Sequence, residues 1–163
     1  MAEIRLLRGQ AALIDDEDLL KIAGYRWLLS AKGYVVAMLG PRNKRKAVWL
    51  HRLVAGTPNG FDTDHRNRNK LDCRKQNLRP ATRRQNTGNR VKQINGKAST
   101  FKGVTWHAQG KGYWRARFRY RDAKAKAHSN HLGLFADETE AARAYDRAAM
   151  AHFGEAFALL NFP

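Results

Sequence analysis

The sequence of 163 residues contains one cysteine and no long apolar run. Because Cys73 has no second cysteine to pair with, an internal disulfide is excluded, and without a CxxC pair the usual structural zinc site is excluded as well. No apolar run approaches the roughly 20 residues that a membrane-spanning helix needs. The N-terminal residues MAEIRLLRGQ lack the apolar stretch of a signal peptide, so we expect a cytoplasmic protein with no membrane partner.

Acidic residues are also scarce. Lys and Arg total 31 against 14 Asp and Glu, which gives a formal net charge of +17. Such an excess predicts a polyanionic partner, and both a membrane surface and nucleic acid meet this description. The length allows one domain or two small ones, each with a modest hydrophobic core.

The most informative stretch runs from residue 61 to 90, FDTDHRNRNKLDCRKQNLRPATRRQNTGNR. It places Asp64 beside His65, with Asn77 and Asn86 further along, in a background of Arg, Lys and Asn. A carboxylate can hold a hard cation, and an imidazole can accept a proton from water. Metal-assisted attack on a phosphodiester needs both groups, so the pattern predicts a nuclease site.

The same residues resemble a known family. The DH pair at Asp64 and His65, the NL pair at Asn77 and Leu78, and Asn86 resemble the HNH endonuclease motif, in the variant whose last histidine is asparagine. The resemblance implies a ββα-metal hairpin and helix, with strands over residues 61–64 and 78–81. It implies that Asp64 and Asn86 coordinate one Mg²⁺ (Mn²⁺ can substitute, and no zinc is expected). His65 is then the general base, and Asn77 braces the loop.

Two assignments within this segment stay open. Thr82 is the expected N-cap of a helix through Asn89, and Asn89 lies on the same helix face as Asn86, which makes it the rival metal ligand. His51, in an HR pair, either approaches the scissile phosphate or has a structural role at a strand-to-helix turn. Candidate phosphate contacts are Arg66, Arg68, Arg74 and Arg83.

The first 47 residues predict a β-rich accessory segment. Strands are expected over residues 4–7, 11–14, 27–30, 34–39 and 47–50, and a short helix opens at the acidic run 15–18 and continues through Ile22. The basic turn at residues 41–46 is either a solvated loop or a phosphate contact.

The C-terminal part has clearer periodicity. After a polar linker at 91–99, strands are expected over residues 102–106, 113–120 and 128–135. In the second strand apolar residues alternate with Arg115, Arg117 and Arg119, which puts the arginines on one face. Asp137 is the expected N-cap of a helix that ends at Gly154. A row of arginines on an open sheet face suits insertion into the major groove.

The motifs FKGVTW, YWRARF, HLGLF, EAARAYDRAA and FGEAFALLNFP resemble an AP2 domain, a family that binds DNA through its sheet. Carried over by position, the implied DNA contacts are Lys102, Thr105, Arg115, Arg117, Arg119, Ser129 and His131. The chain departs from the plant form of the domain at several of these positions, so the plant target sequence does not transfer.

Together these patterns predict an α+β protein in four parts: residues 1–47, a nuclease at 48–90, a linker at 91–99 and an AP2-like domain at 100–163. The implied function is a site-specific DNA endonuclease of the phage homing type. It would act as a monomer on double-stranded DNA in the cytoplasm of a bacterial host cell, with nicking preferred to double-strand cleavage. The alternatives are a DNA-binding regulator with an inactive nuclease site and an RNA-binding protein, which the placement of aromatics on the buried face opposes.

Overall fold

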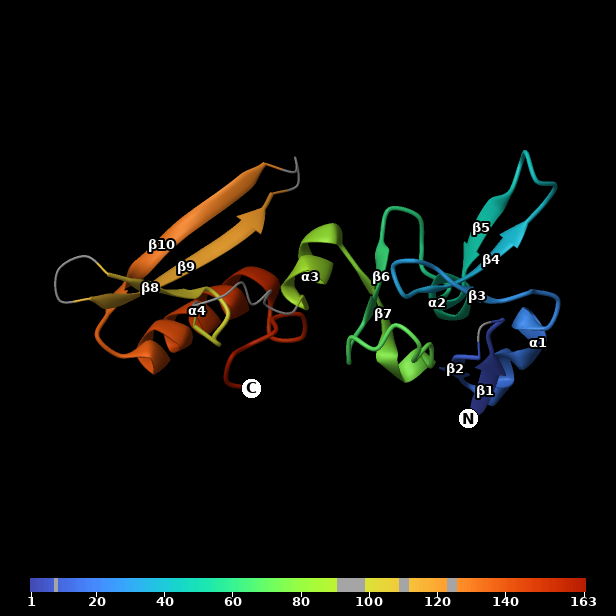
Figure 1. Ribbon diagram of the computed structural model, residues 1–163, viewed down its shortest axis with the longest axis horizontal. Coiled ribbons are helices and arrows are strands. Elements are labelled where there is room, and N and C mark those ends of the chain that lie inside the picture. The colour runs from blue at the N-terminus through green and yellow to red at the C-terminus, as the bar shows by residue number, and fades with distance from the viewer. Residues whose placement is uncertain (8, 91–98, 109–111, 123–125) are drawn as a thin grey trace. The chain divides into compact units, whose positions relative to one another are not determined.

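The computed structural model describes residues 1–7, 9–90, 99–108, 112–122 and 126–163 (Figure 1). These residues form two compact units, Met1–Thr82 and Arg83–Pro163. The sequence placed boundaries after residues 47, 90 and 99, and its linker lies, apart from Ser99, outside the described residues. The mixed α and β content agrees with the expected class. None of the helices in the described part has the length and apolar character needed to cross a membrane.

The first unit contains three small antiparallel sheets and short helices. Strands β1 and β2 form a hairpin, β3, β4 and β5 form a second sheet, and β6 and β7 form another hairpin. In chain order the elements are β1 (Ala2–Arg5), β2 (Ala11–Ile14), η1 (Asp16–Asp18), α1 (Leu19–Ile22), β3 (Leu28–Leu29), β4 (Val35–Leu39), β5 (Lys46–Trp49), α2 (Leu50–Ala55), β6 (Asp62–His65), η2 (Lys75–Asn77) and β7 (Leu78–Ala81).

A single core joins the N-terminal segment to the β6–β7 hairpin. Buried residues from both regions, including Ile14, Val35, Leu50, Cys73 and Leu78, pack in one cluster. The backbone is joined as well: the N–H of Leu13 donates to the carbonyl of Leu71 at 2.8 Å, and the N–H of Cys73 donates to that of Leu13 at 2.8 Å. The expected accessory segment is therefore part of the structure that supports the hairpin.

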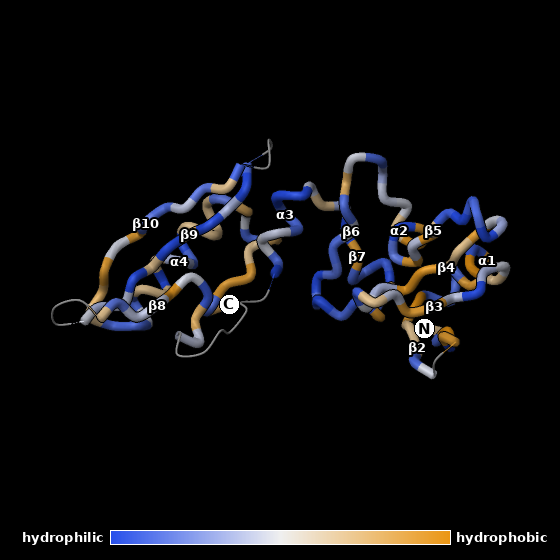
Figure 2. Tube along the Cα trace, turned by 45° about the horizontal axis from the view of Figure 1, so that its top comes forward, coloured by the Kyte–Doolittle hydropathy of each residue, from blue (hydrophilic) through white to orange (hydrophobic). Residues whose placement is uncertain are grey.

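The second unit has one three-stranded antiparallel sheet, in the order β10-β9-β8. Helix α4 packs on the sheet through small side chains, because Ala116 of β9 faces Ala141 and Ala142 of α4 in one buried cluster (Figure 1). The elements are α3 (Arg83–Gly88), β8 (Val104–His107), β9 (Tyr113–Arg121), β10 (Ala127–Phe135) and α4 (Glu138–Phe153). In Figure 2 the tube is blue along much of β9 and orange along β4, a core strand of the first unit.

Local chemistry sets the ends of α4 and its distance from the sheet. The Asp137 carboxylate accepts the backbone N–H of Glu140 at 2.9 Å, which is the predicted N-cap, and Gly154 follows the last turn. Gly103 has φ +79°, and a Cβ there would lie 1.9 Å from the Tyr145 ring. Only glycine lets the start of β8 approach the helix this closely.

Candidate active site

The β6–β7 hairpin carries the predicted catalytic pair. Its register places Asp64 opposite Arg79 and His65 opposite Leu78. Successive strand residues point to opposite faces, so Asp64 and His65 have different surroundings. Both are buried, at 4% and 5% exposure.

Asp64 forms an ion pair with Arg79 across the hairpin. The Nε of Arg79 donates to Oδ2 of Asp64 at 2.8 Å, and Nη2 lies 2.7 Å from the same oxygen. Both side chains are well buried, at 11% and 5% exposure. The arginine therefore balances the charge of the one carboxylate that the sequence assigns to the metal. Sequence reasoning did not identify Arg79, because strands at 61–64 and 78–81 would set it opposite Thr63, whereas the observed β6 begins one residue later and sets it opposite Asp64.

His65 lies on the other side of the strand, in a group of aromatic rings. Its ring centroid is 5.2 Å from that of His51 and 6.0 Å from that of Tyr34. Burial lowers the pKa of His65, and the charges of Asp64 and Asp72 oppose this effect. The imidazole is thus kept neutral near pH 7, which is the form that can accept a proton.

The structure brings His51 to His65. His51 is in the first turn of α2 and is 7% exposed, and burial lowers its pKa to about 3. Among the described residues, its Nδ1 has no hydrogen-bond partner. Trp49 and Tyr34 complete the ring cluster, with centroids 6.2 and 5.2 Å from His51. The sequence had left the place of His51 open.

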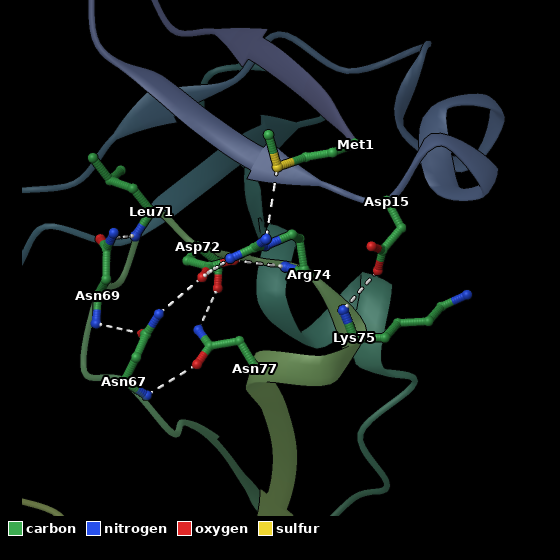
Figure 3. Close-up of polar contacts among 9 residues, drawn as sticks. All are labelled: Met1, Asp15, Asn67, Asn69, Leu71, Asp72, Arg74, Lys75 and Asn77. Carbon is green, nitrogen blue, oxygen red and sulfur yellow. Dashed lines mark hydrogen bonds and ion pairs between the residues drawn. The ribbon is translucent and has the colours of Figure 1, made fainter.

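Asn77 spans the loop that follows His65 (Figure 3). Its side-chain oxygen accepts the N–H of Asn67 at 2.9 Å, and its amide nitrogen donates to the carbonyl of Asp72 at 2.7 Å. Its own carbonyl accepts the N–H of Arg66 at 2.9 Å. These contacts connect the two ends of the loop, and the catalytic importance of this bracing stays a prediction.

Asp72 is the second centre of this loop, and sequence reasoning missed its role. Its carboxylate accepts Asn67 Nδ2 at 2.8 Å and two nitrogens of Arg74 at 2.7 Å (Figure 3). The hydrogen bonds from Arg74 lower the pKa of Asp72. Lys75 extends the network, because its N–H donates to Asp15 at 2.8 Å and its ammonium pairs with Glu17. The acidic turn that contains Asp15 and Glu17 thus anchors Lys75, at the end of the loop that follows His65.

The predicted phosphate contacts differ in their surroundings. Arg66, Arg68 and Arg83 are exposed, whereas the guanidinium of Arg74 is bound to Asp72. The basic turn at 41–46 is exposed between β4 and β5. As DNA contacts all of these remain predictions.

The remaining metal ligand is assigned to a different unit. Asn86 is half-buried on α3, which belongs to the second unit, and its rival Asn89 is buried just after that helix. Within the described residues, no three His, Cys, Asp or Glu side chains are grouped as a metal site. Within the first unit, Asp64 offers carboxylate oxygen, which is a ligand type that a hard divalent cation prefers.

The open face of the second unit's sheet carries most of the predicted DNA contacts. The register sets Thr105 opposite Arg115, His131 opposite Arg117 and Ser129 opposite Arg119, so these six side chains share one face. A groove of about 790 Å³ lies over this region, and none of its lining residues is acidic. Its lining is Arg90, Lys102, Gly103, Val104, Thr105, Arg115, Arg117, Arg119, Arg121 and Tyr145.

Some groove residues depart from expectation. Arg90 and Arg121 were not singled out from the sequence, although Arg121 continues the alternation of β9. Lys102 lines the groove while its ammonium donates to the carbonyl of Gly88 at 3.0 Å. The Nε of Arg115 is buried and lacks a hydrogen-bond acceptor among the described residues. Trp106 lies opposite Trp114, on the face that α4 covers, although it is 48% exposed.

Comparison with known proteins agrees with the first of the two resemblances. Residues 48–87 match the family model described as HNH endonuclease, and this segment contains His51, Asp64, His65, Asn77 and Asn86. No curated protein and no solved structure matches the chain. The match covers 40 of the 163 residues, and over this segment it supports a nuclease of the HNH type, a class of hydrolases that act on DNA and generally use a divalent metal.

Proposed function

We propose that the chain is a site-specific DNA endonuclease whose β6–β7 hairpin hydrolyses phosphodiester bonds. The observation that carries the proposal lies inside the matched segment. There, burial favours the neutral form of His65, next to Asp64 and at the start of a loop that Asn77 braces. A neutral imidazole can accept the proton of an attacking water, which is what general-base hydrolysis requires.

In this mechanism His65 accepts a proton from the attacking water. The water oxygen bonds to phosphorus, and the bond from phosphorus to the 3′ oxygen breaks. The charges of Asp64 and Asp72 raise the pKa of His65, so they stabilise the imidazolium that forms. A divalent cation held by Asp64 and Asn86, proposed as a single Mg²⁺ that Mn²⁺ can replace, would stabilise charge on the phosphate and the leaving oxygen.

The sheet of the second unit is proposed to hold and read the duplex, in the manner of an AP2 domain. Arg115, Arg117 and Arg119 line a groove without acidic residues, and guanidinium groups suit both phosphates and guanine edges. A nuclease hairpin combined with a DNA-reading sheet suits a homing endonuclease that acts as a monomer on double-stranded DNA.

A plasmid-cleavage assay with added Mg²⁺ tests the proposal. Wild-type protein should convert supercoiled DNA to nicked or linear forms, and His65→Ala should lose about 10²–10⁴-fold of the rate, the usual contribution of a positioned base. His128→Ala is the matched control, because this histidine pairs with Asp122 in the second unit and has no part in the chemistry. No cleavage by folded wild-type protein would refute the proposal.

One observation favours the alternative, a DNA-binding regulator with an inactive nuclease site. The Asp64 carboxylate is already neutralised by Arg79. The same assay separates the two functions, since a regulator would bind duplex DNA tightly and leave it intact with Mg²⁺ and with Mn²⁺.

A further inference from the structure

We propose that Arg79 controls access of the cation to Asp64. Without DNA, Arg79 is the counter-ion of this carboxylate. When a duplex binds, Arg79 transfers to a DNA phosphate, and Asp64 then becomes available to the metal. The inference rests on the proposed nuclease function and adds to it a regulation of the same site by its substrate.

The geometry of the ion pair is the first argument. Two nitrogens of Arg79 lie 2.8 and 2.7 Å from the same oxygen of Asp64. The two residues are directly opposite in the β6–β7 register, so the backbone holds the pair together. A divalent cation at this carboxylate would lie close to a buried guanidinium, and the repulsion between like charges in such a site is strong.

The second argument concerns how the pair can separate. Removing one partner from a buried ion pair leaves an uncompensated charge, which is strongly unfavourable. An exchange avoids this cost, because the oxygens of a phosphate can accept hydrogen bonds from the Arg79 guanidinium as a carboxylate does. The cation takes over the charge of Asp64 in the same event. Metal and DNA should therefore bind cooperatively.

The competing explanation is that Arg79 only stabilises the hairpin as a cross-strand pair. Under that explanation its removal weakens folding and does not strengthen metal binding. Metal affinity in the absence of DNA separates the two explanations without any measurement of cleavage.

The experiment is calorimetric titration of Mn²⁺ into the DNA-free full-length protein. Arg79→Gln should bind Mn²⁺ at least about tenfold more tightly than wild type. Arg5→Gln removes the same charge at an exposed position of β1 in the same unit without breaking the Asp64–Arg79 pair, and it should stay within about twofold of wild type. Circular dichroism establishes that each variant is folded. Unchanged or weaker Mn²⁺ binding by Arg79→Gln would overturn the proposal.

If Arg79→Gln does not fold, Arg79→Lys replaces it, since lysine keeps the positive charge and lacks the planar set of N–H donors of the guanidinium. This variant should show a gain of a few-fold, and no gain would count against the exchange.

A second titration adds a short DNA duplex to protein carrying His65→Ala, so that the DNA stays intact. The duplex should strengthen Mn²⁺ binding when Arg79 is present, beyond the Mn²⁺ taken up by DNA alone. It should add little when Arg79 is glutamine. An Arg79 effect on Mn²⁺ binding, together with no cleavage by wild-type protein in the plasmid assay, would leave the exchange standing and the nuclease function refuted. If wild-type protein cleaves DNA but Arg79→Gln does not change Mn²⁺ binding, the nuclease function stands and the exchange is refuted.

Discussion

The buried His51 should make the first unit sensitive to mild acid. Its pKa in the folded protein is about 3, lowered mainly by burial, whereas an exposed histidine titrates near 6.5. Between these values the unfolded chain binds a proton that the folded chain does not. Stability is therefore fully present above about pH 6.5 and is lost as the pH falls toward 3.

The size of the effect follows from the same values. Each pH unit within the window lowers the free energy of unfolding by about 1.4 kcal/mol per histidine. From pH 6.5 to 4.5 His51 alone should cost about 2.5 kcal/mol, or roughly 10–20 °C in the melting temperature of a unit this small. His65, whose pKa is also lowered, adds to the loss. Asp72 does not contribute there, because its lowered pKa places its loss of stability at more acidic pH.

The assay is urea unfolding at several pH values, with hydrogen–deuterium exchange of peptides from residues 1–82 to assign the transition to the first unit. His51→Phe keeps a ring between Tyr34 and His65 and removes the titrating group, so its slope with pH should fall by about 1.4 kcal/mol per unit. Trp49→Phe, which alters the same ring cluster without removing a titrating group, should keep the wild-type slope. Equal acid slopes for wild type and His51→Phe would show that His51 is protonated in the folded protein and would refute the reasoning.

Three further predictions concern the sheet of the second unit and the charge of the whole chain. Arg117→Ala should cost about 1–3 kcal/mol of discrimination between cognate and scrambled duplex, measured by competition binding, while turnover on saturating DNA is kept; unaltered discrimination would show that the sheet does not read sequence. Gly103→Ala should destabilise the unit by about 2–4 kcal/mol, because it adds overlap with Tyr145 to the strain of a positive φ. Gly154→Ala is the control, because Gly154 has φ +80° and open space around its Cβ position, so only the backbone strain should lower its stability. Calorimetry measures both variants, and an equal loss of stability in the two would show that overlap with Tyr145 adds nothing at Gly103. DNA affinity should fall by about 0.9 log units per phosphate contact for each decade of salt, and a flat titration would mean that the +17 charge serves another partner.

Elements governed by local sequence were predicted well. Helix α4 follows from the Asp137 cap and the Gly154 stop, and β7 begins and ends where expected. The arginine face of β9 follows from strict alternation, which the register now extends to Thr105, Ser129 and His131. Helix capping and the alternation of side chains along a strand depend only on residues close together in the sequence, so they can be predicted without knowledge of the fold.

Features that depend on distant contacts could not be predicted in the same way. The pairing of Asp64 with Arg79 needs the hairpin register, which a loop of this length does not fix. The meeting of His51 with His65 needs the packing of α2 against β6, and the link from Leu13 to Cys73 joins segments far apart in the chain. Each of these contacts changes the chemistry assigned to a residue that the sequence had already indicated.

Cys73 makes the joint between the N-terminal hairpin and the nuclease loop accessible to chemical labelling. The thiol is fully buried, and burial raises its pKa to about 12, so the folded protein presents almost no reactive thiolate at neutral pH. A thiol reagent can then modify this side chain only during moments when the joint opens. Since the chain has one cysteine, the labelling rate directly measures the frequency of that opening. The same rate, followed with and without DNA or Mn²⁺, would show whether either ligand tightens the support beneath the catalytic hairpin.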